Sequence, residues 1–450
     1  MARSLRPFPD LSPNLPPSLR FVLGLSPSAM TLGLENISAL MDHLGHPERA
    51  FRSVLIAGTN GKGSTTTMLA SILANEGLRT GRYISPHVFH VAERIAVDGV
   101  FATIDELEAA AARIAPLRDE IAYSYFEALT AIAFWIFAQR GVEVAALEVG
   151  LGGRFDATNI VSPEASIITS ISMDHRRILG DTEEAILAEK LGVTRPGVPL
   201  FVGALKPGLM KIVHERGRRD GFPVFELDDI GTAAIVSESL SGLHVQLSTQ
   251  RAEYGEVRVP FAGKHQAANS LLAVGAAEVV LPKGLEHARE GIEQAFIAGR
   301  FQVIERAGRT FVLDIAHNEE ALRATAEHLA SFARREDVLL IFGLLRRKEL
   351  FDAPVHLLKA AGALCLVEPE SEPGSADTAF APHELLQQFF LPHLPDAATD
   401  VILWNRRHAR DDSLARLAER LERPGDRHRV VVAVGSHRVV QDFGRRIWPT

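Results

Sequence analysis

The most informative segment of the chain is Val54-Leu55-Ile56-Ala57-Gly58-Thr59-Asn60-Gly61-Lys62-Gly63-Ser64. It joins an apolar run to a glycine-rich turn, and the following residues Thr65–Asn75 have a helix-forming composition. A strand that leads through such a turn into a helix N-terminus makes a binding site for polyphosphate. Backbone N–H groups point at the anion, Lys62 reaches the outer phosphates, and the Ser64 hydroxyl can bind Mg²⁺. The glycine spacing differs from that of the common phosphate loop, so an ordinary glycine-rich turn is the alternative.

Composition narrows the class of protein. The chain has 450 residues, 46% of them hydrophobic, which favours two domains with large cores. The net charge of −8 and the 7% aromatic content argue against nucleic acid as a partner. The single cysteine, Cys365, excludes an internal disulfide. The apolar run Ala128–Ala138 is too short to cross a membrane. We therefore expect a cytoplasmic enzyme with no membrane partner, and a mobile arm over residues 1–20.

Short apolar runs alternate with helical stretches along most of the chain, which predicts an α/β fold with parallel sheets. Residues 230–260 mix apolar residues with glycines and polar residues, which indicates antiparallel β structure appended to the first domain. A second α/β series begins after Gly299. We predict an N-terminal arm (1–30), a P-loop ATPase domain with a parallel sheet (31–298) and a smaller Rossmann-like domain (299–450). The expected strands are 53–57, 144–149, 166–172, 199–202, 310–315, 338–342, 363–367, 401–404 and 429–434; the expected helices include 104–114, 125–140, 183–190, 266–280 and 285–298.

Polar residues follow the expected strands, where ligands collect in open α/β sheets. Glu148 ends an apolar run and can hold Mg²⁺ that bridges the phosphates; a carboxylate capping a turn is the alternative. His175, with Asp174, ends another run, and we favour metal ligation over a structural role. Lys190 lies on an expected helix, where a surface lysine is the usual interpretation.

The chain resembles the folylpolyglutamate synthase/dihydrofolate synthase branch of the Mur ligases. The motifs that carry the resemblance span residues 31–440 in the family's order, and together they are specific. They are 32–35, 57–64, Ser85-Pro86-His87 with Glu93-Arg94, 125–130, 148–159, Asp174-His175, Glu189-Lys190, His265-Gln266 with Asn269, Gly299-Arg300-Phe301 and 314–318.

The resemblance implies roles for residues in most of these motifs. The phosphates of ATP would lie on Thr59, Asn60, Gly61, Lys62, Gly63 and Ser64, with Asn269, Arg300 and Asp314 as further nucleotide contacts. Ser85, Glu148 and His175 would bind Mg²⁺, and a carbamate on Lys190 would help to hold a second ion. Dihydropteroate would lie on Ser124, Tyr125, Phe126, Glu127, Phe155, Asp156 and Ala157. His317 would help to organise the site between the domains.

The implied reaction is the ATP-dependent joining of L-glutamate to dihydropteroate or to folates through an acyl phosphate. Both activities are expected, in a monomeric protein. An enzyme with only one of them, a cell-wall Mur ligase, a simple P-loop ATPase and a nucleotide-binding regulator without ligase activity are the alternatives. Several positions depart from the family pattern. They are Arg176-Arg177, Ala298, Glu319, Arg347 in 345–349, and His437-Arg438; Arg347 is the observation that favours a regulator.

Overall fold

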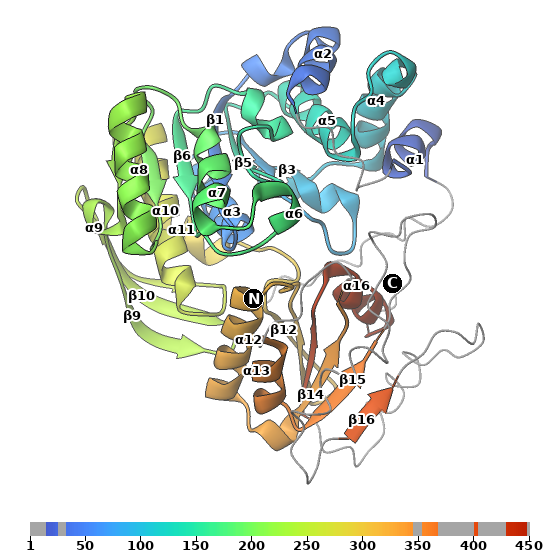
Figure 1. The fold of residues 1–450 in the computed structure, drawn as a ribbon, viewed down its shortest axis with the longest axis vertical. Helices are drawn as coiled ribbons and strands as arrows, with labels where there is room; N and C mark the ends of the chain where they lie inside the picture. The colour runs from blue at the N-terminus through green and yellow to red at the C-terminus, as the bar shows by residue number, and fades with distance from the viewer. Residues whose placement is uncertain (1–14, 26–32, 345–352, 368–399, 404–428, 448–450) are drawn as a thin grey trace.

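The computed structural model describes residues 15–25, 33–344, 353–367, 400–403 and 429–447. Two α/β units are visible in Figure 1, with the C-terminal unit below the N-terminal one. No helix among the described residues is long and apolar enough to cross a membrane. Residues Leu345–Glu349, with the charge change at Arg347, lie outside the described residues.

The first unit contains a sheet of eight strands in the order β4-β3-β2-β5-β1-β6-β7-β8. All neighbours from β2 to β8 in this order are parallel, and β3 and β4 are antiparallel additions at one edge. The central strands are buried along their whole length because helices cover both faces. The strands are β1 (Arg52–Ala57), β2 (Thr80–Tyr83), β3 (Ile95–Val97), β4 (Val100–Phe101), β5 (Val144–Glu148), β6 (Ala165–Ile168), β7 (Leu200–Val202) and β8 (Val224–Phe225).

Two groups of helices enclose this sheet. One hydrophobic cluster includes α5, whose Phe134 and Phe137 are fully buried, and the other includes α3 and α10. The helix α5 is apolar on all sides because it lies between the sheet and outer helices. The helices of this unit are α2 (Glu35–Leu44), α3 (Lys62–Asn75), α4 (Ile104–Ile114), α5 (Tyr125–Gln139), α6 (Arg176–Leu179), α7 (Glu183–Lys190), α8 (Pro207–Asp220), α9 (Leu227–Ile230), α10 (His265–Val280) and α11 (Ala288–Gln294).

The N-terminal segment differs from the expected mobile arm. Residues Pro17–Leu23 form helix α1, and its Leu19 and Val22 are fully buried against the first unit. Glu108 of α4 accepts hydrogen bonds from the backbone N–H groups of Ser18 and Leu19, which otherwise have no partner at a helix N-terminus. The expectation of a mobile arm is therefore wrong for residues 17–20.

The appended antiparallel sheet is confirmed. Its strands are β9 (Gly231–Ser239), β10 (Gly242–Thr249) and β11 (Glu253–Val259), in the order β11-β10-β9. Alternate residues of β10 and β11, including Val245 and Val257, are fully buried in the cluster that contains α10. The sheet therefore packs on the face of the first unit that carries α10.

The second unit contains a sheet in the order β12-β13-β17-β14-β15-β16. All its neighbouring strands are parallel except the β12–β13 pair. The elements are β12 (Gln302–Arg306), β13 (Arg309–Leu313), α12 (Glu319–Phe332), β14 (Val338–Phe342), α13 (Ala353–Ala360), β15 (Ala363–Leu366), β16 (Asp400–Leu403), β17 (Val430–Val434) and α16 (His437–Ile447).

The predicted fold class is confirmed, with differences in detail. The expected strand 166–172 ends at Ile168, because the chain then turns to bond the glycine-rich loop. The expected helix 285–298 is shortened to Ala288–Gln294. Strands β2, β3, β4, β8 and β12 were not expected from the sequence. The division between residues 298 and 299 stays a prediction.

Candidate active site

The predicted site residues meet at one edge of the first sheet. Strand β1 lies between β5 and β6, and Ile56 is the direct partner of both Glu148 and Ile167. Ser85 follows β2, the next strand beyond β5. Because parallel strands end at the same edge of a sheet, the loop after β1 lies beside Glu148, with Ser85 one strand further along the same edge.

The loop after β1 has the backbone that its glycines allow. Gly61 has a φ of +86°, and a Cβ there would lie 2.9 Å from the side-chain amide of Asn269. The backbone N–H of Asn60 donates to Ser170 Oγ, and its carbonyl oxygen accepts from Thr169 Oγ1 at 2.6 Å. Helix α3 begins at Lys62, three residues before the predicted start. The N-terminus of α3 therefore follows the glycine turn directly, as a polyphosphate site requires.

The Lys62 side chain folds back onto this loop. Its Nζ donates to the carbonyl oxygens of Gly58 at 3.0 Å and Thr59 at 3.1 Å. Burial lowers the pKa of Lys62, and the negative charge of Glu148 partly opposes this effect. A bound phosphate would offer stronger acceptors than these two carbonyls.

Glu148 is a buried carboxylate, with 1% of its surface exposed. It accepts a hydrogen bond from the backbone N–H of Ser85 at 2.8 Å. Burial raises the pKa of Glu148, whereas the charges of Lys62 and Arg300 lower it. An oxygen donor set of Glu148, Ser85 and Ser64 suits Mg²⁺, and a divalent cation would offset the cost of burying this carboxylate. The structure therefore fits the expected metal at this position.

A small cavity of about 30 Å³ is lined by Lys190 and His175, together with Thr59, Lys62 and Asp174. The Nζ of Lys190 donates to the Gly58 carbonyl oxygen, and only 4% of the residue is exposed. The usual interpretation of a surface lysine is thus wrong. His175 Nε2 lies 3.8 Å from Asp174 Oδ2. Within the described part of the chain, no group of three or more His, Cys, Asp or Glu has a metal-binding arrangement, so ligation by His175 stays a prediction.

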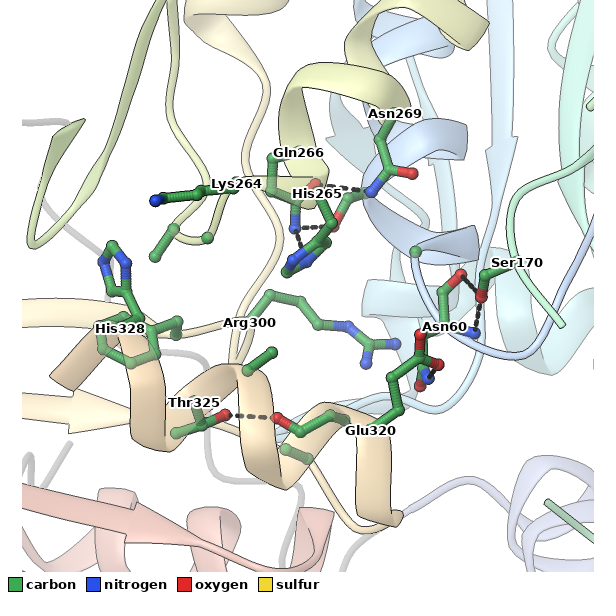
Figure 2. A pocket seen from close by; sticks show the side chains of 18 of the residues that line it. Asn60, Ser170, Lys264, His265, Gln266, Asn269, Arg300, Glu320, Thr325 and His328 are labelled. Carbon is green, nitrogen blue, oxygen red and sulfur yellow. Dashed lines mark hydrogen bonds between the residues drawn. The ribbon is translucent and has the colours of Figure 1, made fainter. Parts of the chain in front are cut away.

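A large cavity of about 560 Å³ opens between α10 and α12. Figure 2 shows His265, Gln266 and Asn269 on one side, Glu320, Thr325 and His328 on the other, and Arg300 reaching between them. Thr59 and Lys62 line the small cavity, and the other predicted nucleotide contacts line the large one. These are Asn60, Gly61, Gly63, Ser64, Asn269, Arg300 and Asp314.

Asp314 contributes a second buried carboxylate to this cavity. Its Oδ2 accepts from Thr325 Oγ1 at 2.6 Å, and its Oδ1 accepts from the backbone N–H of Ala316. Burial raises the pKa of Asp314, and Arg300 lowers it. Asp314 and Arg300 thus bring one acidic and one basic side chain from the second unit to the predicted nucleotide contacts of the first unit.

The two units are joined by hydrogen bonds at the tip of the glycine-rich loop. Asn318 Nδ2 donates to Asn60 Oδ1 at 2.9 Å and to Asp174 Oδ2 at 3.3 Å. Asn60 Nδ2 in turn donates to Glu320 Oε2 at 2.6 Å. His317 Nε2 lies 3.9 Å from Asp174 Oδ2, and its Nδ1 contacts the Ile315 carbonyl oxygen. These hydrogen bonds connect the glycine-rich loop to the N-terminal end of α12.

The expected pterin contacts divide into two groups. Ser124 and Glu127 cap helix α5 reciprocally, and Asp156 accepts hydrogen bonds from Thr158 and Leu151, so these three side chains also hold local structure. Burial raises the pKa of Asp156. Phe155, by contrast, is 45% exposed. Tyr125 lies under the Arg94 guanidinium, Phe126 packs on Tyr83, and Ala157 is buried.

Sequence reasoning missed several residues of this region. Asn318 and Gln266 stand in motifs that were recognised without being given a role, and Glu320 has no sequence signal. Two of the departures from the family pattern form local ion pairs: Arg176 pairs with Asp181, and Glu319 pairs with Arg323 on the surface of α12.

Comparison with known proteins gives matches over both units. The Mur ligase middle domain matches residues 56–277, and the Mur ligase glutamate ligase domain matches residues 299–437. A Bacillus subtilis dihydrofolate synthase/folylpolyglutamate synthase is 33% identical over 330 residues, which cover 70% of this chain and 76% of that protein.

Solved structures with the same fold include nucleotide complexes. Mycobacterium tuberculosis folylpolyglutamate synthase complexed with ADP and AMPPCP has 30% identity and a TM-score of 0.76, over 92% of this chain and 94% of that one. Escherichia coli FolC in complex with DHPP and ADP has 27% identity and a TM-score of 0.78, over 95% and 96% of the two chains.

Proposed function

Since the chain belongs to the Mur ligase family, in its dihydrofolate synthase/folylpolyglutamate synthase branch, we propose that it joins L-glutamate to dihydropteroate and to folyl(poly)glutamates at the expense of ATP. The observation that carries the proposal is the position of Lys62. This side chain, Gly58 and Thr59 line the small cavity, whereas Asn60, Gly61, Gly63 and Ser64 line the large one. A nucleotide in the large cavity would thus present its last phosphate towards an acceptor at the small one.

The reaction needs an activated carboxylate. A carboxylate oxygen of the acceptor attacks the γ-phosphorus of ATP, and ADP leaves. The amine of glutamate then attacks the carbonyl carbon of the acyl phosphate; the C–N bond forms, phosphate leaves and the amine loses its proton. The protein needs no covalent nucleophile, so alignment and charge neutralisation dominate catalysis.

The residues of the site can be given roles in these steps. Lys62 and Arg300 neutralise negative charge on the transferring phosphoryl group. His317, whose Nδ1 contacts the Ile315 carbonyl oxygen and whose Nε2 lies 3.9 Å from Asp174 Oδ2, would help to organise the site between the units. Closure of α12 on the glycine-rich loop would exclude water from the acyl phosphate.

The proposed reaction also uses metal ions, for which the site offers several ligands. Ser64, Ser85 and Glu148 would hold Mg²⁺, and His175 would join them after a change in its side-chain position. When bound, the ion supplies positive charge to the phosphates of ATP. Lys190, once carbamylated, would offer a carboxylate to a second ion. The buried position of Lys190 beside Gly58 and Lys62 supports this assignment.

The balance between the two acceptors is a separate question. Both the B. subtilis relative and an E. coli relative carry the double name, whereas a Lacticaseibacillus casei relative is named folylpolyglutamate synthase alone. The exposed ring of Phe155 favours a pterin-binding role. We propose a bifunctional enzyme; its monomeric state and cytoplasmic location also stay predictions.

Phosphate release tests the proposal directly. With ATP, Mg²⁺ and glutamate present, we expect release that depends on dihydropteroate and, in a separate reaction, on tetrahydrofolate. Release with one acceptor alone would identify a monofunctional enzyme. ATP binding without any release would favour the regulator, and release that needs neither acceptor would favour a simple ATPase.

A further inference from the structure

Gln266 lies in the first turn of α10 with only 5% of its surface exposed. Its Nε2 lies 3.3 Å from Ser64 Oγ and 3.2 Å from His265 Nε2, and its Oε1 accepts from Asn269 Nδ2 at 2.9 Å. The dashed lines in Figure 2 follow these contacts around the upper wall of the large cavity. A buried amide with three side-chain partners is held in one orientation.

The orientation of the Gln266 amide determines which of its atoms donates and which accepts each hydrogen bond. Because Oε1 accepts the Asn269 amide proton, Nε2 is the donor to Ser64 Oγ. A hydroxyl that accepts one hydrogen bond keeps its own proton and a second lone pair for other groups. In a metal–phosphate complex, the Ser64 hydroxyl would use the lone pair to bind the cation and the proton to bond a phosphate oxygen.

The same side chain contacts the glycine-rich loop at a second point through Asn269. The Asn269 amide lies against Gly61, where a Cβ would approach it to 2.9 Å. Gln266 thereby contacts Ser64 in the first turn of α3 and, through Asn269, Gly61 directly before that helix. Its influence on the loop does not require direct contact with a ligand.

We propose that Gln266 is a positioning residue that orients the Ser64 hydroxyl for the magnesium complex of the nucleotide. The inference rests on the proposed function, because it assigns a metal–nucleotide ligand to the Ser64 side of the cavity. It predicts that Gln266 affects binding of Mg²⁺–ADP more than binding of ADP alone.

The test is direct measurement of ADP binding with and without Mg²⁺, by calorimetry, on the full chain. We expect Gln266→Met to weaken Mg²⁺–ADP binding by about tenfold, the effect of one lost hydrogen bond, and metal-free ADP by less than threefold. Ser270→Ala is the matched control, because Ser270 is buried on the same helix and its hydroxyl bonds its own helix at the Ala267 carbonyl. It should leave both affinities unchanged.

A double-mutant cycle shows whether Gln266 acts through Ser64. We expect Ser64→Ala and the Ser64→Ala/Gln266→Met double variant to bind Mg²⁺–ADP equally. Additive losses, or equal weakening with and without Mg²⁺, would overturn the inference. If Gln266→Met does not fold, Gln266→Asn, whose amide ends one methylene short of Ser64, takes its place with the same expectation.

Failure of the inference and failure of the proposed function give different results. A wild-type protein that binds Mg²⁺–ADP without ligase activity would contradict the proposed function, and the cycle would still decide the role of Gln266. A wild-type protein that binds no ADP under either condition would overturn both.

Discussion

The Nζ of Lys190 donates a 2.8 Å hydrogen bond to the carbonyl oxygen of Gly58, 132 residues earlier in the chain. The contact holds a buried lysine directly behind the glycine-rich loop. Burial, reinforced by the nearby charge of Lys62, lowers the pKa of Lys190 from 10.5 to about 7. A substantial fraction of the side chain is therefore a neutral amine near neutral pH, which is the form that can react with CO₂.

This amine leads to a prediction about activity. The reaction of the neutral amine with CO₂ yields a carbamate and a proton, so, at the same concentration of dissolved CO₂, enzyme freed of CO₂ should recover faster at pH 8 than at pH 6. We expect Lys190→Ala to lower glutamate-dependent phosphate release roughly 10- to 100-fold, and acetate to restore part of the rate. Lys206→Ala, which removes an exposed lysine paired with Glu183, is the control. Full activity of Lys190→Ala with Mg²⁺ would contradict the carbamate.

The same pKa predicts how stability depends on pH. Between about pH 7 and 10.5 the unfolded chain keeps the Lys190 proton and the folded chain has lost it. The contribution of this group to the free energy of unfolding therefore rises with pH through that window and is lowest below pH 7. In CO₂-free buffer, Lys190→Met should raise the Tm most at pH 6.5, and the gain should shrink towards pH 10. A gain that is constant with pH would argue against the low pKa.

A third prediction concerns Glu148. If this carboxylate holds the metal at the phosphates, Glu148→Gln should lower turnover about 10³-fold, comparable to the loss of a principal electrostatic contact. The Tm should not fall, because the substitution removes a charge that is costly to bury. Glu143→Gln is the control, because Glu143 lies just before the same strand and its carboxylate accepts a hydrogen bond from the backbone N–H of Arg79. This substitution should leave turnover nearly unchanged. Near-normal phosphate release from Glu148→Gln would remove Glu148 from the metal site.

A fourth prediction concerns the acceptor. Phe155 is 45% exposed and its ring contacts the Arg154 guanidinium, so much of the ring surface is open for stacking on a pterin. We expect Phe155→Ala to raise KM for dihydropteroate about tenfold, a loss of roughly 1.4 kcal/mol, with an unchanged Tm. Phe21→Ala, which truncates a similarly exposed ring on α1, is the control. An unchanged KM for dihydropteroate and for tetrahydrofolate would place the pterin elsewhere.

The sequence predicted the parts of this site that depend on local pattern. The glycine-rich loop and Glu148 follow from apolar runs that form the neighbouring parallel strands β1 and β5. The sheet topology therefore brings these two predicted parts of the site together. The antiparallel strands in 230–260 were equally evident, because alternating burial leaves a period of two in the sequence.

Other features depend on contacts between distant segments and left no local signal. The interdomain bonds of Asn60 join it to residues 258 and 260 positions later. The burial of Lys190 follows from the packing of α7 behind the loop, since its helical sequence alone resembles an exposed surface. Short strands such as β3 and β4 were missed because three or two residues carry too little periodicity to recognise.

In the proposed reaction, the acceptor carboxylate is phosphorylated before the amide forms. The decisive experiment supplies dihydropteroate labelled with ¹⁸O in its carboxylate, together with ATP, Mg²⁺ and glutamate. We expect the released phosphate to carry one ¹⁸O atom for each amide bond formed, because the oxygen that attacks the γ-phosphorus leaves with it. Unlabelled phosphate, produced at the same rate as the amide, would show that water rather than the acceptor receives the phosphoryl group, and would contradict the proposed reaction.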